Sequence, residues 1–180
     1  MLITKEDFKA YINYNLTTYD TEITELLRES IALAENYCNN SIVSKDVVEI
    51  VDSTAKSFLS NSNDLRDIKC YNKNGDNWTE IEDFNVKGRQ IIFNNWNESI
   101  NGRKISYSCG YTEDVQGQPN DYPLPADLKL AILKIAGALW NKRRSDGVAS
   151  ESIDGSSINY SELWSADITS ILDNYKIIHL

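Results

Sequence analysis

Histidine and cysteine, the side chains that most often carry nucleophilic or metal chemistry, are scarce in this sequence. The one histidine, His179, is the penultimate residue, and the three cysteines, Cys38, Cys70 and Cys109, are far apart. A Ser-His-Asp or Cys-His arrangement would have to use a chain end, which is a poor scaffold for orienting a base. We predict that His179 is incidental and that the cysteines are buried, reduced thiols.

The sequence also has no motif for metal, nucleotide or phosphate binding. It contains no CxxC pair, HExxH, EF-hand loop, GxGxxG or GK[ST] loop. The acidic pairs Glu82-Asp83 and Glu113-Asp114 could hold a hard cation, but neighbouring acids on a surface segment are more often solvated. We therefore predict no catalytic residue, no cofactor and no metal ion.

The charge balance argues against a DNA-binding regulator. The chain has 18 Lys and Arg against 27 Asp and Glu, a formal net charge of −9. Such a protein repels DNA rather than holding it through many phosphate contacts. The cations Lys142, Arg143 and Arg144 either complement a helix dipole or form a nucleic-acid patch, and we favour the first because no aromatic interleaving supports the second.

The chain length and the hydropathy pattern indicate one domain outside a membrane. At 180 residues the chain can bury one good core. Its N-terminal segment has neither a basic start nor an unbroken apolar block, and no run of about 18 apolar residues occurs. We expect a soluble protein that is not exported by a signal peptide.

The most apolar element is the segment 123–144, which the rest of the chain must surround. Pro123 and Pro125 mark its start, and a run of large apolar residues follows: Leu128, Leu130, Ile132, Leu133, Ile135, Leu139 and Trp140. A surface helix would show one apolar stripe, whereas here few polar residues interrupt the run. The pattern predicts the central helix of the core.

Three other helices are predicted around it. Thr4 and Asp7 have the spacing of a capping box at the start of a helix over residues 5–14. Asp20 can cap an amphipathic helix that reaches Cys38, because its apolar residues recur three and four positions apart. Ser165 can cap a last short helix.

Between these helices, residues 46–111 alternate between apolar and polar in the manner of strands. Asn74-Gly75 and Asn101-Gly102 favour hairpin turns. The fold class predicted from these patterns is α+β, with a predominantly helical bundle core formed by residues 1–45 and 123–175. A β-rich insert of hairpins or a small sheet occupies residues 46–111.

Two segments have compositions that suit contacts with partners. Residues 145–161 are rich in Ser and Gly and have few large apolar groups, so they predict a flexible loop. The loop is either disordered or becomes ordered on a partner, and long loops inside compact domains are often functional. The C-terminal segment 176–180 is apolar for a free chain end.

The order of these features resembles the head-tail connector (adaptor) proteins of tailed bacteriophages. The similarity rests on the amphipathic helix TEITELLRESIALAENYCNN, the pair Gly110-Tyr111, the proline-marked entry to the apolar helix at 122–144, the Ser-Glu-Ser sequence at 150–152 and a last helix ending ILDNYK. Nearly the whole chain fits in order, so the resemblance implies a single connector domain over residues 1–180.

The resemblance implies a structural virion protein without enzymatic activity. Subunits of this family form a ring, usually a dodecamer, beneath the portal, and the ring extends the DNA channel toward the next neck or tail protein. The protein would be in the host cytoplasm before assembly and at the head-tail interface of the virion afterwards, with no membrane contact. DNA would pass through the channel without specific binding.

The resemblance also suggests which residues contact the portal or neighbouring subunits. They lie in the flexible loop and at the C-terminus: Ser150, Glu151, Ser152, Ile153, Ile158, Tyr160, Ile177, Ile178 and Leu180. Two alternatives stay open, another phage neck or head-completion component and, with less support, a small enzyme of unknown substrate. A tail-terminator or head-closure barrel is disfavoured by the long apolar helix.

Overall fold

A computed structural model of the protein describes residues 1–52, 54–94, 102–113, 120–143, 150–153, 156–159 and 163–178, and only the backbone of residues 150–153 and 156–159. These residues form two compact units. We call them the helical unit, Met1–Cys38 with Glu113–Lys176, and the sheet unit, Asn39–Thr112 with Ile177–Leu180. The single connector domain inferred from the resemblance stays a prediction.

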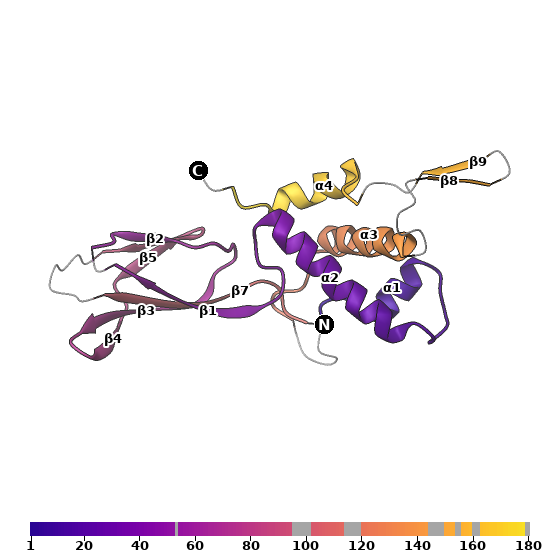
Figure 1. Ribbon diagram of the computed structural model, residues 1–180. Coiled ribbons are helices and arrows are strands. Elements are labelled where there is room, and N and C mark those ends of the chain that lie inside the picture. The colour runs from indigo at the N-terminus through magenta and orange to yellow at the C-terminus, as the bar shows by residue number, and fades with distance from the viewer. Residues whose placement is uncertain are drawn as a thin grey trace. The chain divides into compact units, whose positions relative to one another are not determined.

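The helical unit contains the four α-helices of the described chain, which Figure 1 labels α1 to α4. Their bounds, with the 3-10 helix η1 that follows them, are α1 Lys5–Tyr11, α2 Asp20–Cys38, α3 Ala126–Lys142, α4 Ala166–Leu172 and η1 Asp173–Tyr175. Helices α2 and α3 pack against each other, and α4 packs against α3. All four helices were predicted, α3 from its nearly unbroken apolar run, α2 from its apolar spacing, and α1 and α4 from capping residues.

The capping box at the start of α1 is confirmed. The Thr4 hydroxyl accepts a hydrogen bond from the Asp7 backbone N–H at 3.1 Å, and the Asp7 carboxylate accepts one from the Thr4 backbone N–H at 2.9 Å. The helix is shorter than predicted and ends at Tyr11. Asn13 follows with a φ of 53°, a left-handed conformation that asparagine tolerates and that a helix cannot continue through.

Helix α3 forms the centre of the helical unit, as its composition predicted. It buries seven residues: Leu128, Ala131, Ile132, Leu133, Ile135, Ala136 and Gly137. They meet the buried face of α2, which includes Ile23, Leu27 and Ile31. One side of α3 stays open to solvent, because Leu130 is 41% exposed.

The sheet unit consists of two antiparallel sheets. Its strands are β1 Lys45–Val51, β2 Ser57–Leu59, β3 Arg66–Asn74, β4 Asn77–Ile81, β5 Phe84–Lys87, β6 Gln90–Phe93 and β7 Arg103–Cys109. The four-stranded sheet has the order β1-β7-β3-β4, and the three-stranded sheet has the order β2-β6-β5. Strand β7 alternates between buried and half-buried residues, and Ile105, Tyr107 and Cys109 are buried on the same side.

The sheets enclose a second hydrophobic core. Its buried members come from β3, β6 and β7: Cys70, Ile91, Phe93, Ile105, Tyr107 and Cys109. The turn predicted at Asn74-Gly75 joins β3 to β4, and Gly75 has the positive φ, 59°, that such a turn requires. The turn predicted at Asn101-Gly102 includes Asn101, which lies outside the described residues. Strand β7, which follows it, pairs with β1 and β3.

The prediction of a predominantly helical bundle core with a β-rich insert is therefore wrong. Two antiparallel sheets form a unit with its own core, so the strands are a principal part of the fold and not an insert into a bundle. The physical reason is that each strand buries only alternate residues. The second core is thus spread over short segments of the sequence, whereas the core residues of α3 stand together.

The segment predicted to be a flexible loop contains two short strands. Strand β8, Ser150–Ile153, pairs with β9, Ser156–Asn159, in an antiparallel hairpin. The remaining residues of the loop, 145–149, 154–155 and 160–161, lie outside the described residues, so its flexibility stays a prediction. Among the described helices, none is both long enough and apolar enough to span a membrane.

Candidate functional site

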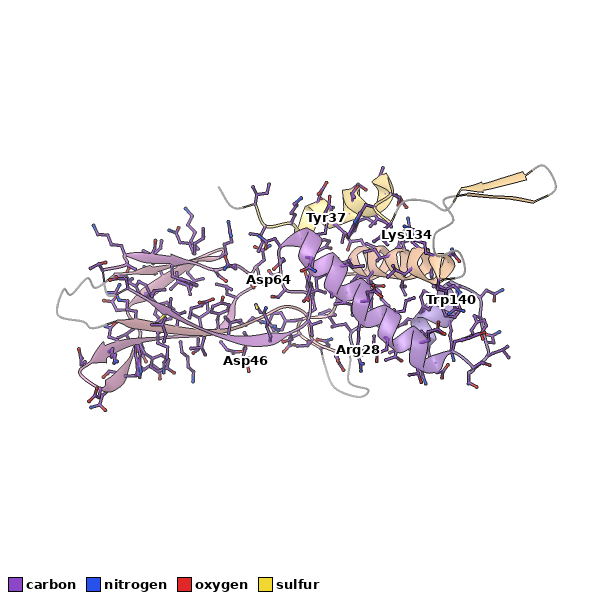
Figure 2. All side chains as sticks on the ribbon, in the orientation of Figure 1. Arg28, Tyr37, Asp46, Asp64, Lys134 and Trp140 are labelled. Atoms are coloured by element: carbon purple, nitrogen blue, oxygen red, sulfur yellow. The ribbon has the colours of Figure 1, made fainter. Side chains whose placement is uncertain are left out.

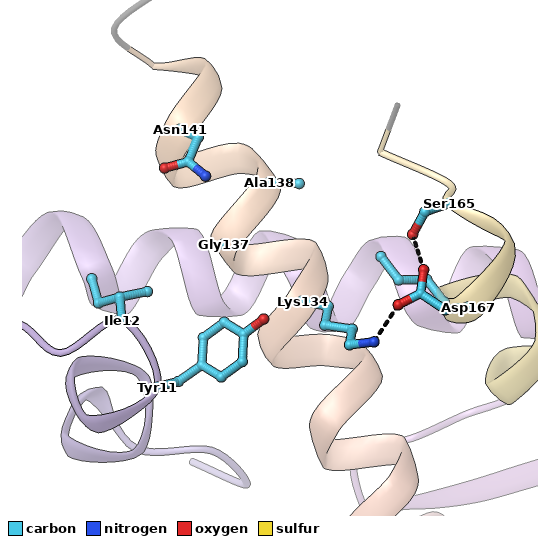
Figure 3. A pocket seen from close by; sticks show the side chains of 9 residues that line it. Tyr11, Ile12, Lys134, Gly137, Ala138, Asn141, Ser165 and Asp167 are labelled. Carbon is cyan, nitrogen blue, oxygen red and sulfur yellow. Dashed lines mark hydrogen bonds and ion pairs between the residues drawn. The ribbon is translucent and has the colours of Figure 1, made fainter. Parts of the chain in front are cut away.

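A groove of about 400 Å³ lies in the helical unit between the end of α1, one side of α3 and the start of α4. Figure 3 shows Tyr11 and Ile12 facing it from one side and Ser165 and Asp167 from the other. Gly137 on α3 lets the Tyr11 ring approach the helix closely, because a Cβ atom there would lie 3.3 Å from that ring. The lining mixes apolar and polar groups.

One ion pair crosses this groove. Lys134 of α3 donates to the carboxylate of Asp167 in α4, and the Ser165 hydroxyl donates to the same carboxylate. The hydrogen bond from Lys134 lowers the pKa of Asp167 to about 2, and the same bond raises the pKa of Lys134. Both groups therefore stay charged near neutral pH, and their ion pair joins α3 to α4.

An aromatic cluster gathers around Trp140 at the end of α3, labelled in Figure 2. The ring centroids of Phe8, Tyr14 and Tyr19 lie 5.9, 5.9 and 5.7 Å from that of Trp140. The Arg143 guanidinium carbon lies 3.0 Å from the Trp140 ring centroid, and its Nη1 lies 3.2 Å from Glu22. Arg143 is thus engaged within the helical unit.

A second set of contacts anchors α4 and η1 to the end of α2. The Tyr37 hydroxyl donates to Asp173 at 2.9 Å, and the Tyr37 ring stacks on Trp164 with centroids 5.0 Å apart. The Cys38 thiol donates to the Leu172 carbonyl at 3.5 Å, and burial raises the pKa of this thiol to about 11. These contacts fix the chain just before its C-terminal segment.

The predicted partner-binding residues of the loop fall on the β8–β9 hairpin. Its register sets Glu151 opposite Ile158 and Ile153 opposite Ser156, while Ser150 and Ser152 pair with Asn159 and Ser157. The hairpin thereby brings Ile158 beside the Ser-Glu-Ser sequence, which the residue order alone did not show. Tyr160 lies outside the described residues.

The predicted partner-binding residues of the C-terminus differ from one another in exposure. Ile177 is buried, whereas Ile178 is 68% exposed. Arg89, which sequence reasoning missed, donates to the carbonyl oxygens of Ile178 at 3.1 Å and Ser60 at 3.2 Å. Nothing in the sequence signals this contact, because Arg89 and Ile178 are 89 positions apart. Leu180 lies outside the described residues.

The described side chains include no group of three or more His, Cys, Asp or Glu residues that could hold a metal ion. The three cysteines are free and buried, as predicted. Burial raises the pKa of the Cys70 thiol to about 11, so it is a packing group and a poor nucleophile.

Comparison with known families identifies the chain over nearly its whole length. The sequence model of a family described as "Head completion protein" matches residues 1–178. The chain belongs to the head completion protein family. The protein is therefore a structural component of a phage neck or head completion, at the head-tail interface of a virion. The predicted resemblance to phage head-tail connectors is confirmed at this level.

Solved structures of similar fold come from gene transfer agent particles. A chain of "Virion of native gene transfer agent (GTA) particle" matches with a TM-score of 0.66 and 12% identity, covering 99% of this head completion protein and 91% of the other chain. Chains of "Neck of empty GTA particle computed with C6 symmetry" and "Neck of native GTA particle computed with C12 symmetry" match with TM-scores of 0.63 and 0.62, at 9% and 8% identity. Both cover the same shares, 99% and 91%. No curated protein is significantly similar.

Proposed function

We propose that this head completion protein forms a ring in the neck of the particle, without enzymatic activity. The ring would extend the DNA channel from the portal to the next neck or tail component. The observation that carries the proposal is the match of the family over residues 1–178, together with a fold shared over 99% of the chain with neck proteins.

The symmetry of those neck structures supports a ring of twelve subunits. One neck was computed with C12 symmetry and another with C6, and a ring of twelve copies is compatible with both. Identical subunits that contact each other head to tail close into a ring when the rotation between them divides a full turn. The dodecamer is therefore the assembly that we propose.

The acidic charge of the protein supports a channel through which DNA slides. Each copy has a net charge of −9, and repetition around a ring multiplies the negative potential. Such a surface repels phosphate groups, so DNA would pass without specific binding.

We assign contact with the portal or with neighbouring subunits to the two segments selected from the sequence. They are the hairpin segment 145–161 and the C-terminal residues Ile178 and Leu180. Ile177, also selected from the sequence, is buried and is left out of the proposed contact surface. Support comes from Ile178, whose side chain is exposed while Arg89 holds its carbonyl. The contacts of Tyr37 and Cys38 hold the preceding helix, so the segment starts from a fixed point.

Deletion of the hairpin segment tests this assignment. Replacing residues 145–161 by a short Gly-Ser linker should leave a folded chain, because α3 and α4 keep the Lys134–Asp167 pair. We expect the variant to lose binding to purified portal in a pull-down assay. A linker of the same composition replacing the exposed β3–β4 turn is the control and should bind normally. Normal portal binding by the hairpin deletion would contradict the assignment while leaving the ring untouched.

A further inference from the structure

One face of the four-stranded sheet combines cations, aromatic rings and exposed aliphatic side chains. The register places Ile50 of β1, Lys104 of β7 and Tyr71 of β3 in one row, and Val48, Ser106 and Lys69 in the next. Lys73 and Trp78 form a further cross-strand pair on this face. We call it the outer face and define it by seven residues: Val48, Ile50, Lys69, Tyr71, Lys73, Trp78 and Lys104.

Two of the three lysines of the outer face, Lys73 and Lys104, lie over its aromatic rings. The Lys104 ammonium lies 4.2 Å from the centroid of Tyr71 and 5.2 Å from that of Trp78. The Lys73 ammonium lies 5.8 Å from Trp78. Cations held over rings lose less freedom when they bind an anion than cations on free chains. The outer face is therefore prepared for a partner with negative charge.

The acids on this face do not cancel its lysines. Glu80 stands opposite Tyr71, and Asp46, labelled on β1 in Figure 2, accepts a hydrogen bond from Ser108 at 2.7 Å. Three lysines thus face two carboxylates, an excess of positive charge in a chain of net charge −9.

Strand β1 adds an aliphatic margin to the outer face. Val48 is 62% exposed and Ile50 is 71% exposed, although valine and isoleucine are usually buried. Their neighbours Val47 and Val51 point to the other side and pack against the core of the sheet unit. Strand β1 is therefore apolar on both sides while only one side is covered, which is typical of a surface that a partner completes.

The helical unit has the complementary charge. It contains 9 Lys and Arg against 17 Asp and Glu, a net charge of −8, whereas the sheet unit contains 9 against 10, a net charge of −1. The exposed side of α2 contributes Glu22, Glu25 and Glu29, and Leu16, just before α2, is 62% exposed. A second copy of this chain thus offers carboxylates for the lysines and a leucine for the aliphatic margin.

Two of these glutamates already have partners within the chain. Glu22 pairs with Arg143 at 3.2 Å and Glu25 pairs with Arg28 at 2.5 Å. Their side chains are nevertheless 50% and 64% exposed. Since a carboxylate can accept several hydrogen bonds, both retain room for a lysine from outside.

We propose that the outer face of one copy binds the acidic side of α2 in the next copy. This inference rests on the proposed ring and identifies the surfaces that join its subunits. The two surfaces are different, so the contact is head to tail and repeats around the ring. Duplex DNA is a poorer occupant, because phosphates give no contact to Val48 and Ile50 and the whole chain is acidic.

Charge reversal on the outer face tests the inference. The variant Lys69→Glu/Lys104→Glu should lose the ring species that the wild-type chain forms, as measured by mass photometry over a series of concentrations. The control Lys56→Glu/Lys87→Glu changes exposed lysines in and beside the other sheet by the same total charge and should assemble normally. Circular dichroism checks that both variants are folded. The wild-type ring should also weaken as salt is added.

Reversal of the partner surface identifies the occupant. Adding Glu25→Lys/Glu29→Lys to the outer-face variant should restore the ring, because the charges are exchanged across the contact. Normal assembly of the outer-face variant would overturn the inference and leave the proposed ring intact. The inference would also be overturned if the charge-exchange variant failed to form the ring. It would be overturned as well if the outer-face variant assembled normally but lost binding to DNA. If the wild-type chain forms no ring alone or in particles, the proposed function itself fails.

Discussion

Asp167 is the residue whose charge depends most clearly on the fold. Its pKa is lowered from 3.8 to about 2, first by the hydrogen bond from Lys134 and then by that from Ser165. A carboxyl whose folded pKa is depressed stabilises the protein above its unfolded pKa, and this stabilisation disappears as the pH falls through the folded pKa. For Asp167, the stabilisation should therefore be lost as the pH falls from about 4 to about 2.

Removing the charge of Asp167 should make the free energy of unfolding depend less on pH in the acid range. We predict that Asp167→Asn lowers the free energy of unfolding at neutral pH, where the Lys134 pair is present, and has a smaller effect near pH 2. Urea unfolding across this pH range measures the difference. Asp76→Asn, in the exposed β3–β4 turn, is the control. An equal effect of the two substitutions at every pH would contradict the role of the pair.

Gly110 is a position where no other residue fits. Its φ is 82°, and a Cβ atom there would lie 2.5 Å from the Val43 carbonyl oxygen and 2.7 Å from its carbon. Gly88 has a similar φ of 58°, but nothing lies within 4 Å of its Cβ position. The two glycines therefore separate the cost of a left-handed backbone from the cost of a clash.

We predict that Gly110→Ala destabilises the protein by about 3 kcal/mol or more, because backbone atoms of Val43 must move. Gly88→Ala should cost about 1 kcal/mol, the strain of a left-handed alanine alone. Thermal and urea unfolding measure both. If both variants lost a similar amount of unfolding free energy, the contact with Val43 would not be the reason that position 110 requires glycine.

Sequence reasoning at the residue scale succeeded where the signal is local. Thr4 and Asp7 are three positions apart, and the cysteines stand in apolar patterns, so the cap and the buried thiols could be predicted. The partner of Lys134 is 33 positions away and that of Tyr37 is 136 positions away. Contacts of this kind exist only after folding and leave no periodic signal.

At the scale of elements, α3 shows how burial divides one apolar helix. Leu128 is fully buried and Leu130, two positions later, is 41% exposed. The same residue type thus occurs on the covered side and on the open side of one helix, at similar distance from its N-terminus. Substituting each leucine by alanine changes helix propensity equally at the two positions, so the difference in unfolding free energy reports the contribution of packing.

We predict that Leu128→Ala costs about 2–5 kcal/mol of unfolding free energy, through lost burial and a cavity. Leu130→Ala should cost less than about 1 kcal/mol, since much of its side chain stays in water. Denaturant unfolding of both variants gives the comparison. A cost for Leu130→Ala as large as that for Leu128→Ala would mean that a partner or another segment covers the open side.

The elements also explain why the fold class was predicted wrongly. A helix such as α3 shows its buried residues within one segment, so the sequence made it look like the core of the whole chain. The core of the sheet unit contains Cys70 of β3, Ile91 of β6 and Ile105 of β7. Each of these residues has a polar residue next to it in the sequence. Strand pairing depends on residues far apart in sequence, which alternation alone does not specify.

At the scale of the whole molecule, the two units differ in charge and in exposed surface. The helical unit carries nearly all of the negative charge, and the sheet unit carries the outer face with its lysines and exposed aliphatic residues. A chain with such different surfaces is suited to head-to-tail contact with its own copies. Membership of the head completion protein family and the fold shared with neck proteins agree with that use.

Electron microscopy of particle necks tests the central claim most directly. We predict a symmetric reconstruction with twelve copies of this chain in a closed ring between the portal and the next neck or tail component, as for the neck computed with C12 symmetry. The outer face of each copy should lie against α2 of its neighbour. Particles that have a complete neck without this chain, or that hold it as isolated copies outside a ring, would contradict the account.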